Sequence, residues 1–121
     1  MKSDNKHGIG MRFALNGIRL VFSQRNFIIQ SIFSGLVVVA GFLFQLTTVE
    51  WCIILICIAG VLSMELLNSA IELIVDQISP NYSLFAKHAK DMAAGAVLIS
   101  AVVSAIIGLI IFIPKFIDLY L

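Results

Sequence analysis

Two glutamates that lie seven residues apart, Glu65 and Glu72, interrupt a hydrophobic segment long enough to cross a membrane. A carboxylate near the centre of a bilayer costs about 2.5–3.5 kcal/mol on insertion scales. Chains keep such residues when an ion, a proton or a polar substrate offsets that cost. We therefore predict a buried acidic site on this segment.

Two further polar residues share the helix face of these glutamates. At about 100° per residue, Asn68 and Asp76 project to the same side as Glu65 and Glu72. The two glutamates are about 10 Å apart along the helix axis, which suits a groove better than one acid–base pair. A structural hydrogen bond to a neighbouring helix is the simpler explanation for one glutamate, and it accounts less well for a shared polar face. For Asp76, a solvated helix end and a place in the site both stay open.

A lysine at the start of the next apolar segment could bind a phosphate group. Lys90 and Asp91 stand where we expect that helix to begin, and a helix N-terminus favours phosphate. The lysine ammonium adds a mobile positive charge. Because Mg²⁺ prefers one or two carboxylates plus substrate phosphates, the set suits a magnesium–nucleotide complex. The sequence has no glycine-rich loop of a standard nucleotide site, and Lys90 alone is also explained by contact with lipid headgroups.

The composition predicts an all-α integral membrane protein with one domain over residues 1–121. The chain is 60% hydrophobic and 12% charged, and its mean hydropathy is +1.05. About 20 apolar residues are needed to cross a bilayer. We expect three such spans at residues 27–46, 51–75 and 92–113, the last closed by Pro114.

An amphipathic helix is predicted before the first span, at residues 9–23, lying on the membrane surface. Its polar side carries Arg12, Asn16 and Arg19. It serves as a lipid anchor or, as a second possibility, also covers the acidic site. In the third span, the small residues Ser100, Ser104 and Gly108 repeat every four residues, which predicts close helix packing and oligomerisation.

The distribution of positive charge predicts the orientation of the spans. Five Lys or Arg residues precede the first span, and Lys87 and Lys90 lie between the second and the third. The link at residues 47–50 carries no cation. The positive-inside rule then places the N-terminus and the loop 76–91 in the cytoplasm. Glu72 is expected near the inner interface, within reach of cytoplasmic ATP.

Two blocks of sequence resemble a known family. Residues 65–72 read E-L-L-N-S-A-I-E and residues 89–91 read A-K-D, which is similar to the signature of the small bacterial membrane diacylglycerol kinases and undecaprenol kinases. The resemblance implies a homotrimer in the bacterial inner membrane, with active sites between subunits at the cytoplasmic surface. It implies phosphoryl transfer from MgATP to the hydroxyl group of a membrane lipid. The partners it implies are the lipid, ATP and further copies of the chain, with no nucleic acid.

The resemblance also implies roles for individual residues on the second span. Glu65 would be the base that takes the hydroxyl proton, Glu72 would bind Mg²⁺, and Asn68 would hold the phosphates or the lipid headgroup. Gln24 stands where many members carry a glutamate that shares the metal. An amide oxygen still ligates Mg²⁺ but brings no charge.

The nucleotide itself is expected between the second and third spans. By resemblance, Lys90 and Asp91 would contact its phosphate and ribose. The residues expected to line the rest of the nucleotide pocket are Asn81, Tyr82 and Ser83.

The lipid substrate and two other functions stay open. The run from Lys90 to Gly95 and the Pro114-Lys115 ending look more like the undecaprenol branch than the diacylglycerol branch. An ion or proton carrier would also keep glutamates in a span, but it would need more polar residues on the facing helices. A purely structural role in the membrane would not explain why Glu65, Asn68 and Glu72 share one helix face.

Overall fold

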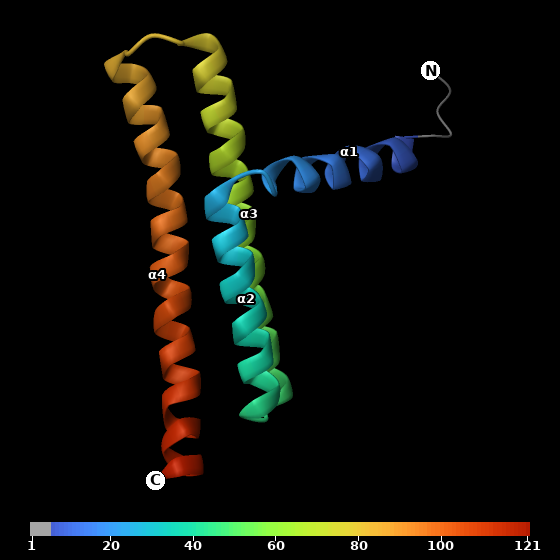
Figure 1. Cartoon of the computed structure of the whole chain (residues 1–121), viewed down its shortest axis with the longest axis vertical. Coiled ribbons are helices and arrows are strands. Elements are labelled where there is room, and N and C mark those ends of the chain that lie inside the picture. The colour runs from blue at the N-terminus through green and yellow to red at the C-terminus, as the bar shows by residue number, and fades with distance from the viewer. Residues whose placement is uncertain (1–5) are drawn as a thin grey trace.

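The computed structural model describes residues 6–121, which form four helices and no strand (Figure 1). The helices are α1 (Lys6–Val21), α2 (Arg25–Leu43), α3 (Thr48–Ile78) and α4 (Leu84–Tyr120). The last three are long and apolar enough to cross a membrane. The prediction of an all-α protein with one short helix followed by three spans is confirmed. Lys2, which contributed to the charge pattern, lies outside the described residues.

The helices extend beyond the apolar stretches that predicted them. α3 continues to Ile78, and α4 begins eight residues before the expected start at residue 92. The expected end of the last helix at Pro114 is wrong, because α4 passes through this proline. A proline removes one backbone donor, and helices within membranes tolerate that loss. Hydropathy marks only the part of a helix that lies in lipid, so it does not detect polar turns at the ends.

The turn between α2 and α3 lies at residues 44–47, slightly before the predicted link at 47–50. The Leu46 N–H donates to the Gly41 carbonyl (3.1 Å), and Gln45 takes the left-handed conformation with φ 55°. Thr47 caps α3, since its hydroxyl accepts a hydrogen bond from the Glu50 N–H (3.3 Å). The Glu50 carboxylate accepts from the Thr47 N–H in return (3.4 Å), which completes a capping box.

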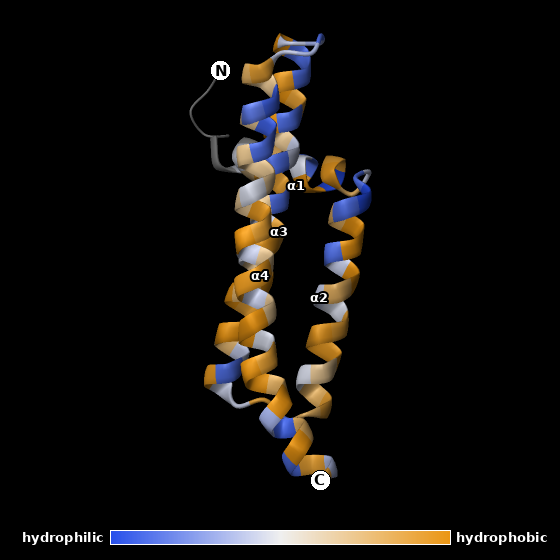
Figure 2. Cartoon of the chain, turned by 90° about the vertical axis from the view of Figure 1, so that its left-hand side faces the viewer, coloured by the Kyte–Doolittle hydropathy of each residue, from blue (hydrophilic) through white to orange (hydrophobic). Residues whose placement is uncertain are grey.

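α3 packs mainly against α4, whereas α2 stands apart from this hairpin over much of its length and approaches α3 near the turn that joins them (Figure 2). Two ion pairs join α3 to α4, one near each end of α3. Glu50 pairs with Lys115 (3.1 Å), and Asp76 pairs with Lys90. At about 1.5 Å per residue the two pairs are about 39 Å apart along α3 and about 38 Å apart along α4. The matched lengths show that the two helices run antiparallel without a shift of register.

α1 lies across the direction of the long helices and projects away from them (Figure 1). It meets α3 around a cavity of about 360 Å³, whose α3 wall runs from Leu66 to Leu73. α2, which starts directly after α1, has 19 residues and is therefore about 28 Å long, close to the thickness of the hydrocarbon core. The α3–α4 hairpin extends beyond the level of α1, and hydrophilic residues gather on that extension (Figure 2).

This arrangement sets the depth of the acidic residues. Glu65 lies one residue before the part of α3 that lines the cavity with α1, so it lies about level with α1. Glu72 and Asp76 follow on the extension. The predicted second span at 51–75 lies within α3, which is long and apolar enough to cross a membrane.

Candidate active site

One face of α3 packs against the neighbouring helices, and its character changes along the helix. The buried residues of α3 are Ile54, Val61, Glu65 and Asn68, which recur at helical spacing. The face is thus apolar near the α2–α3 turn and polar toward the other end. Glu65 is only 5% exposed and Asn68 is 9% exposed. The polar face that the sequence predicts is therefore turned into the protein rather than toward lipid.

Small residues of α4 leave room beside this polar face. Ala86 and Ala93 are the buried residues of α4. Further along α4, a Cβ added to Gly60 of α3 would lie 3.7 Å from the Ser100 hydroxyl oxygen, an ordinary contact distance. The predicted stripe of small residues thus brings α4 close to α3 within one chain. Ser104 and Gly108 line a cavity of about 160 Å³ between the three long helices.

Asn68 is hydrogen-bonded on one side only. Its amide nitrogen donates to a carboxylate oxygen of Glu72 at 3.4 Å. Its amide oxygen is buried and has no hydrogen-bond partner among residues 6–121. A buried acceptor without a partner costs free energy, and a native protein usually satisfies it with a ligand, water or ion. Asn68 therefore offers an acceptor, suited to a hydroxyl group or a cation, and less suited to phosphate oxygens.

The loop between α3 and α4 forms a second part of the site. A pocket of about 320 Å³ opens there, and the predicted residues Asn81, Tyr82, Ser83 and Lys90 all line it. Ser83 caps α4 by accepting a hydrogen bond from the Ala86 N–H (3.0 Å). Tyr82 is 82% exposed, so its ring is free to cover a ligand.

Lys90 and Asp91 do not stand at a helix N-terminus, which corrects the prediction made from the sequence. α4 begins at Leu84, so Lys90 and Asp91 are its seventh and eighth residues, about two turns from its start. The free N–H groups of the first turn lie instead beside Ser83. The apolar run that starts at Met92 conceals the true start, because residues 84–91 form about two further turns whose charged residues lower the hydropathy.

Each lysine at the pocket has an acidic partner. Lys90 pairs with Asp76 across the two helices, and Lys87 pairs with Asp91 (2.6 Å) within α4. Asp91, a predicted nucleotide contact, does not itself line the pocket. It is paired with Lys87, which does. Asp76, whose place in the site the sequence left open, lines the pocket, and so does Lys87, which the predicted site did not include. Lys87 could have been found from the sequence, because it lies four residues before Asp91, a spacing that favours an ion pair on a helix.

Gln24 lies beside α3, at the cavity that α1 and α3 form. It lines the cavity between α1 and α3, together with Ser69 and Leu73, on the neighbouring face of α3. Its side chain makes no capping hydrogen bond at the start of α2. Its assignment as a metal ligand stays a prediction that a single chain does not test.

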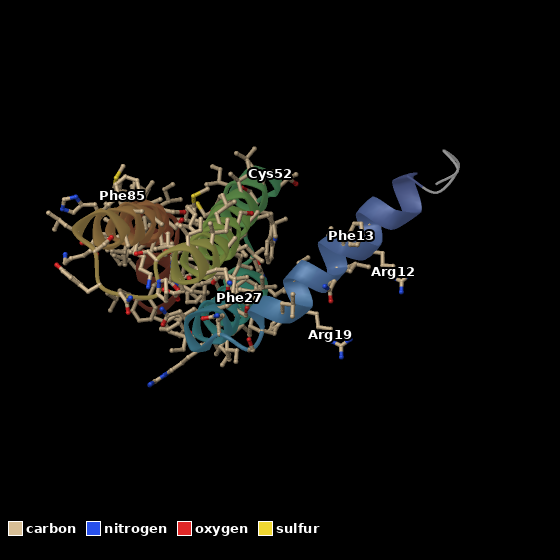
Figure 3. The ribbon with its side chains drawn as sticks, turned by 90° about the horizontal axis from the view of Figure 1, so that it is seen from above. Arg12, Phe13, Arg19, Phe27, Cys52 and Phe85 are labelled. Atoms are coloured by element: carbon tan, nitrogen blue, oxygen red, sulfur yellow. The ribbon has the colours of Figure 1, made fainter. Side chains whose placement is uncertain are left out.

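The polar side of α1 does not cover the acidic face of its own chain. Arg12 and Arg19 point away from the three long helices (Figure 3). They line a separate surface groove along α1 with Asn16. The expectation that this side roofs the site is therefore wrong for a single chain, because α1 turns its apolar residues Leu20 and Val21 toward α3.

The described residues contain no group of three or more His, Cys, Asp or Glu side chains placed to hold a metal ion. Mg²⁺ needs fewer protein ligands, because substrate phosphates and waters complete its octahedron. The Glu72 carboxylate and the unpartnered oxygen of Asn68 are hard oxygen donors of the required kind. The residues present therefore fit a magnesium ion that is shared with a nucleotide.

Comparison with known proteins identifies the family. The prokaryotic diacylglycerol kinase family matches residues 12–112. The undecaprenol kinase of Bacillus subtilis is 50% identical over 93 residues, which cover 77% of this chain and 76% of that protein. A diacylglycerol kinase of Synechocystis sp. is 34% identical over 113 residues, covering 92% of this chain and 65% of that protein. The Escherichia coli K12 diacylglycerol kinase is 48% identical over 46 residues, or 38% of each chain.

The family match and the three apolar helices agree with the polar face and the pocket described above. They favour a kinase over the carrier and the structural protein that the sequence left open. The chain therefore belongs to the prokaryotic diacylglycerol kinase family and is a membrane-embedded lipid kinase.

Proposed function

We propose that the chain transfers the γ-phosphate of MgATP to the hydroxyl group of a membrane lipid alcohol, and that its substrate is undecaprenol rather than diacylglycerol. The proposal rests on one observation, the continuous polar face of α3. It runs from the buried Glu65, level with α1, to the charged pocket at the end of the hairpin. A lipid hydroxyl and a water-soluble nucleotide can meet along such a face.

Glu65 is the base in this proposal. Its carboxylate takes the proton of the lipid hydroxyl, and the lipid oxygen forms a bond to the γ-phosphorus. The bond between that phosphorus and the β–γ bridging oxygen breaks, and ADP leaves. Phosphoryl transfer depends mainly on positioning and on stabilising the phosphate charge. The burial of Glu65 supports this role, because it fixes the carboxylate at the depth where a lipid hydroxyl lies.

The nucleotide extends from the loop pocket toward Glu65. Its adenosine occupies the pocket beside Asn81, Tyr82 and Ser83, and its phosphates pass Lys90 on the way along α3. Asp91 contacts the ribose, as the resemblance implies.

A magnesium ion shared with the phosphates would be held by Glu72 and by the amide oxygen of Asn68, and it would neutralise charge on the transferred group. The hydrogen bond from the Asn68 amide nitrogen holds the Glu72 carboxylate beside Asn68. Gln24 would complete this set as a neutral oxygen ligand. In the proposed homotrimer, the projecting α1 and the start of α2 would reach a neighbouring site.

The lipid alcohol enters beside α1. The cavity between α1 and α3 is lined mostly by apolar residues and lies at the level of Glu65. Its depth supports the entry of an isoprenoid or acyl chain from the bilayer. The preference for undecaprenol rests on the similarity to the relative of that name over most of both chains. We place the protein in the bacterial inner membrane with the hairpin loop and the N-terminus in the cytoplasm, where ATP is present.

Phosphate transfer in detergent micelles tests the substrate. Undecaprenol and diacylglycerol would be offered separately to the purified protein with MgATP, and the rates compared. We expect faster transfer to undecaprenol. A faster rate with diacylglycerol would assign the chain to the other branch, and no transfer to either lipid would contradict the proposed reaction.

A further inference from the structure

We propose that Asp76 is a positioning residue that holds the ammonium group of Lys90 at the nucleotide phosphates. The inference rests on the proposed function, which makes Lys90 a phosphate contact. Asp76 lies on the polar face of α3, four residues beyond Glu72, and Lys90 lies on α4. The ion pair thus joins the two helices at the rim of the loop pocket, which both residues line.

A free lysine would position its charge poorly. Its stem has four methylene groups, and ordering them costs conformational entropy when a ligand binds. The side chain of Lys90 is 39% exposed, so packing alone does not fix it. Its ammonium carries three donors, and one bond to Asp76 leaves the others for phosphate. Asp76 therefore orders Lys90 before the nucleotide arrives.

Two alternative roles for this ion pair lead to different expectations. If Asp76 competed with phosphate for the lysine, its removal would strengthen nucleotide binding. If the pair only braced the hairpin, any pair of opposite charges would serve as well. The side chain of Asp76 is 63% exposed, and ion pairs with that exposure contribute little to stability. A bracing role alone therefore accounts for the pair less well.

Kinetic measurements with the full-length protein in micelles separate the three roles. We expect Asp76→Asn to raise KM for MgATP about tenfold and to change kcat less than threefold. D76E keeps the carboxylate, so its KM should stay close to that of the wild type. The exchanged double variant D76K/K90D should keep a thermal midpoint near that of the wild type and yet be as impaired as K90M, a variant that lacks the ammonium group. An unchanged or lowered KM in D76N, or an active exchanged variant, would overturn the proposal.

Glu50→Gln provides the matched control. It breaks the other ion pair between α3 and α4, at the opposite end, where Glu50 and Lys115 are about 22% and 24% exposed. We expect E50Q to lower the thermal midpoint while KM for MgATP stays unchanged. An equal rise of KM in E50Q would show that any loss of hairpin rigidity has this effect, and it would overturn the specific role of Asp76.

Nucleotide binding measured without turnover distinguishes failure of this inference from failure of the proposed function. Thermal protection by MgATP reports binding to the native state directly. If MgATP protects the wild-type protein but no phosphate is transferred, the kinase reaction is contradicted. The inference about Asp76 is then still tested, because it predicts that MgATP protects D76N less than the wild type. A wild-type protein without protection or transfer would overturn both.

Discussion

The amide nitrogen of Asn68 lies 3.4 Å from a carboxylate oxygen of Glu72, one turn further along α3. The amide oxygen of the same side chain is buried and unpartnered among the described residues. One half of Asn68 thus orients Glu72, and the other half is left for a ligand. This relationship links the two residues that we propose hold the magnesium ion.

Replacing Asn68 with leucine should separate stability from activity. Leucine has a similar volume and removes a buried amide whose oxygen is unsatisfied, a change that is often neutral or stabilising. We expect N68L to keep or raise the thermal midpoint and to lose at least about 99% of phosphate transfer. Unfolding in micelles and transfer rates check the two halves of the prediction. A clearly destabilised variant would mean that the amide is satisfied in the native protein.

Glu72→Gln should weaken nucleotide binding that depends on magnesium. The amide keeps the shape of the side chain but removes the charge that attracts the cation. We expect the apparent Kd for MgATP, from thermal protection, to rise at least about tenfold, by analogy with the loss when groups around a metal are altered. Asp118→Asn removes a carboxylate near the other end of α4 and serves as the control. Equal affinity in E72Q and wild type would rule out Glu72 as the metal ligand.

Much of this fold follows from the periodicity of the chain. Apolar runs predicted three spans. Because a helix turns about 100° per residue, the three- and four-residue intervals between Glu65, Asn68 and Glu72 predicted a common face. The sequence did not show where polar turns lengthen the helices, because hydropathy is insensitive to them. Ser83, a capping residue, was the local signal for the true start of α4.

Gln45→Gly should stabilise the turn between α2 and α3. Gln45 has φ 55°, a conformation that costs a residue with a side chain about 1 kcal/mol relative to glycine. The variant should therefore unfold at a higher temperature by an amount near that free energy, with unchanged transfer. Gln45→Ala retains the Cβ and should show no gain. If Q45G were no more stable than wild type, the left-handed backbone would not be strained.

Gly41 and Gly35 form a matched pair within α2. A Cβ at Gly41 would lie 2.6 Å and 2.9 Å from ring atoms of Trp51 on α3, whereas a Cβ at Gly35 would meet nothing within 4 Å. We expect Gly41→Ala to destabilise the protein by about 1–3 kcal/mol, the usual cost of overpacking. Gly35→Ala should cause no loss, since alanine favours helix. Similar unfolding midpoints for both variants would contradict the close approach of α2 and α3.

The pairing of distant residues was beyond the reach of the sequence. Asp76 and Lys90 carry opposite charges, but only the antiparallel register of α3 and α4 brings them together. The orientation of α1 was also not predictable, because an amphipathic pattern identifies the polar side without saying which way it points. For this reason Arg12 and Arg19 were assigned a possible place over the site, and they instead point away from it.

The central claim is that Glu65, buried about level with α1, is the base that activates the lipid hydroxyl. The most direct test compares Glu65→Gln with wild type in two measurements, phosphate transfer and thermal protection by MgATP. We predict that transfer falls about 10²–10⁴-fold, the usual contribution of a general base, while protection by MgATP stays within twofold. Transfer by E65Q at a rate near that of wild type would contradict the account.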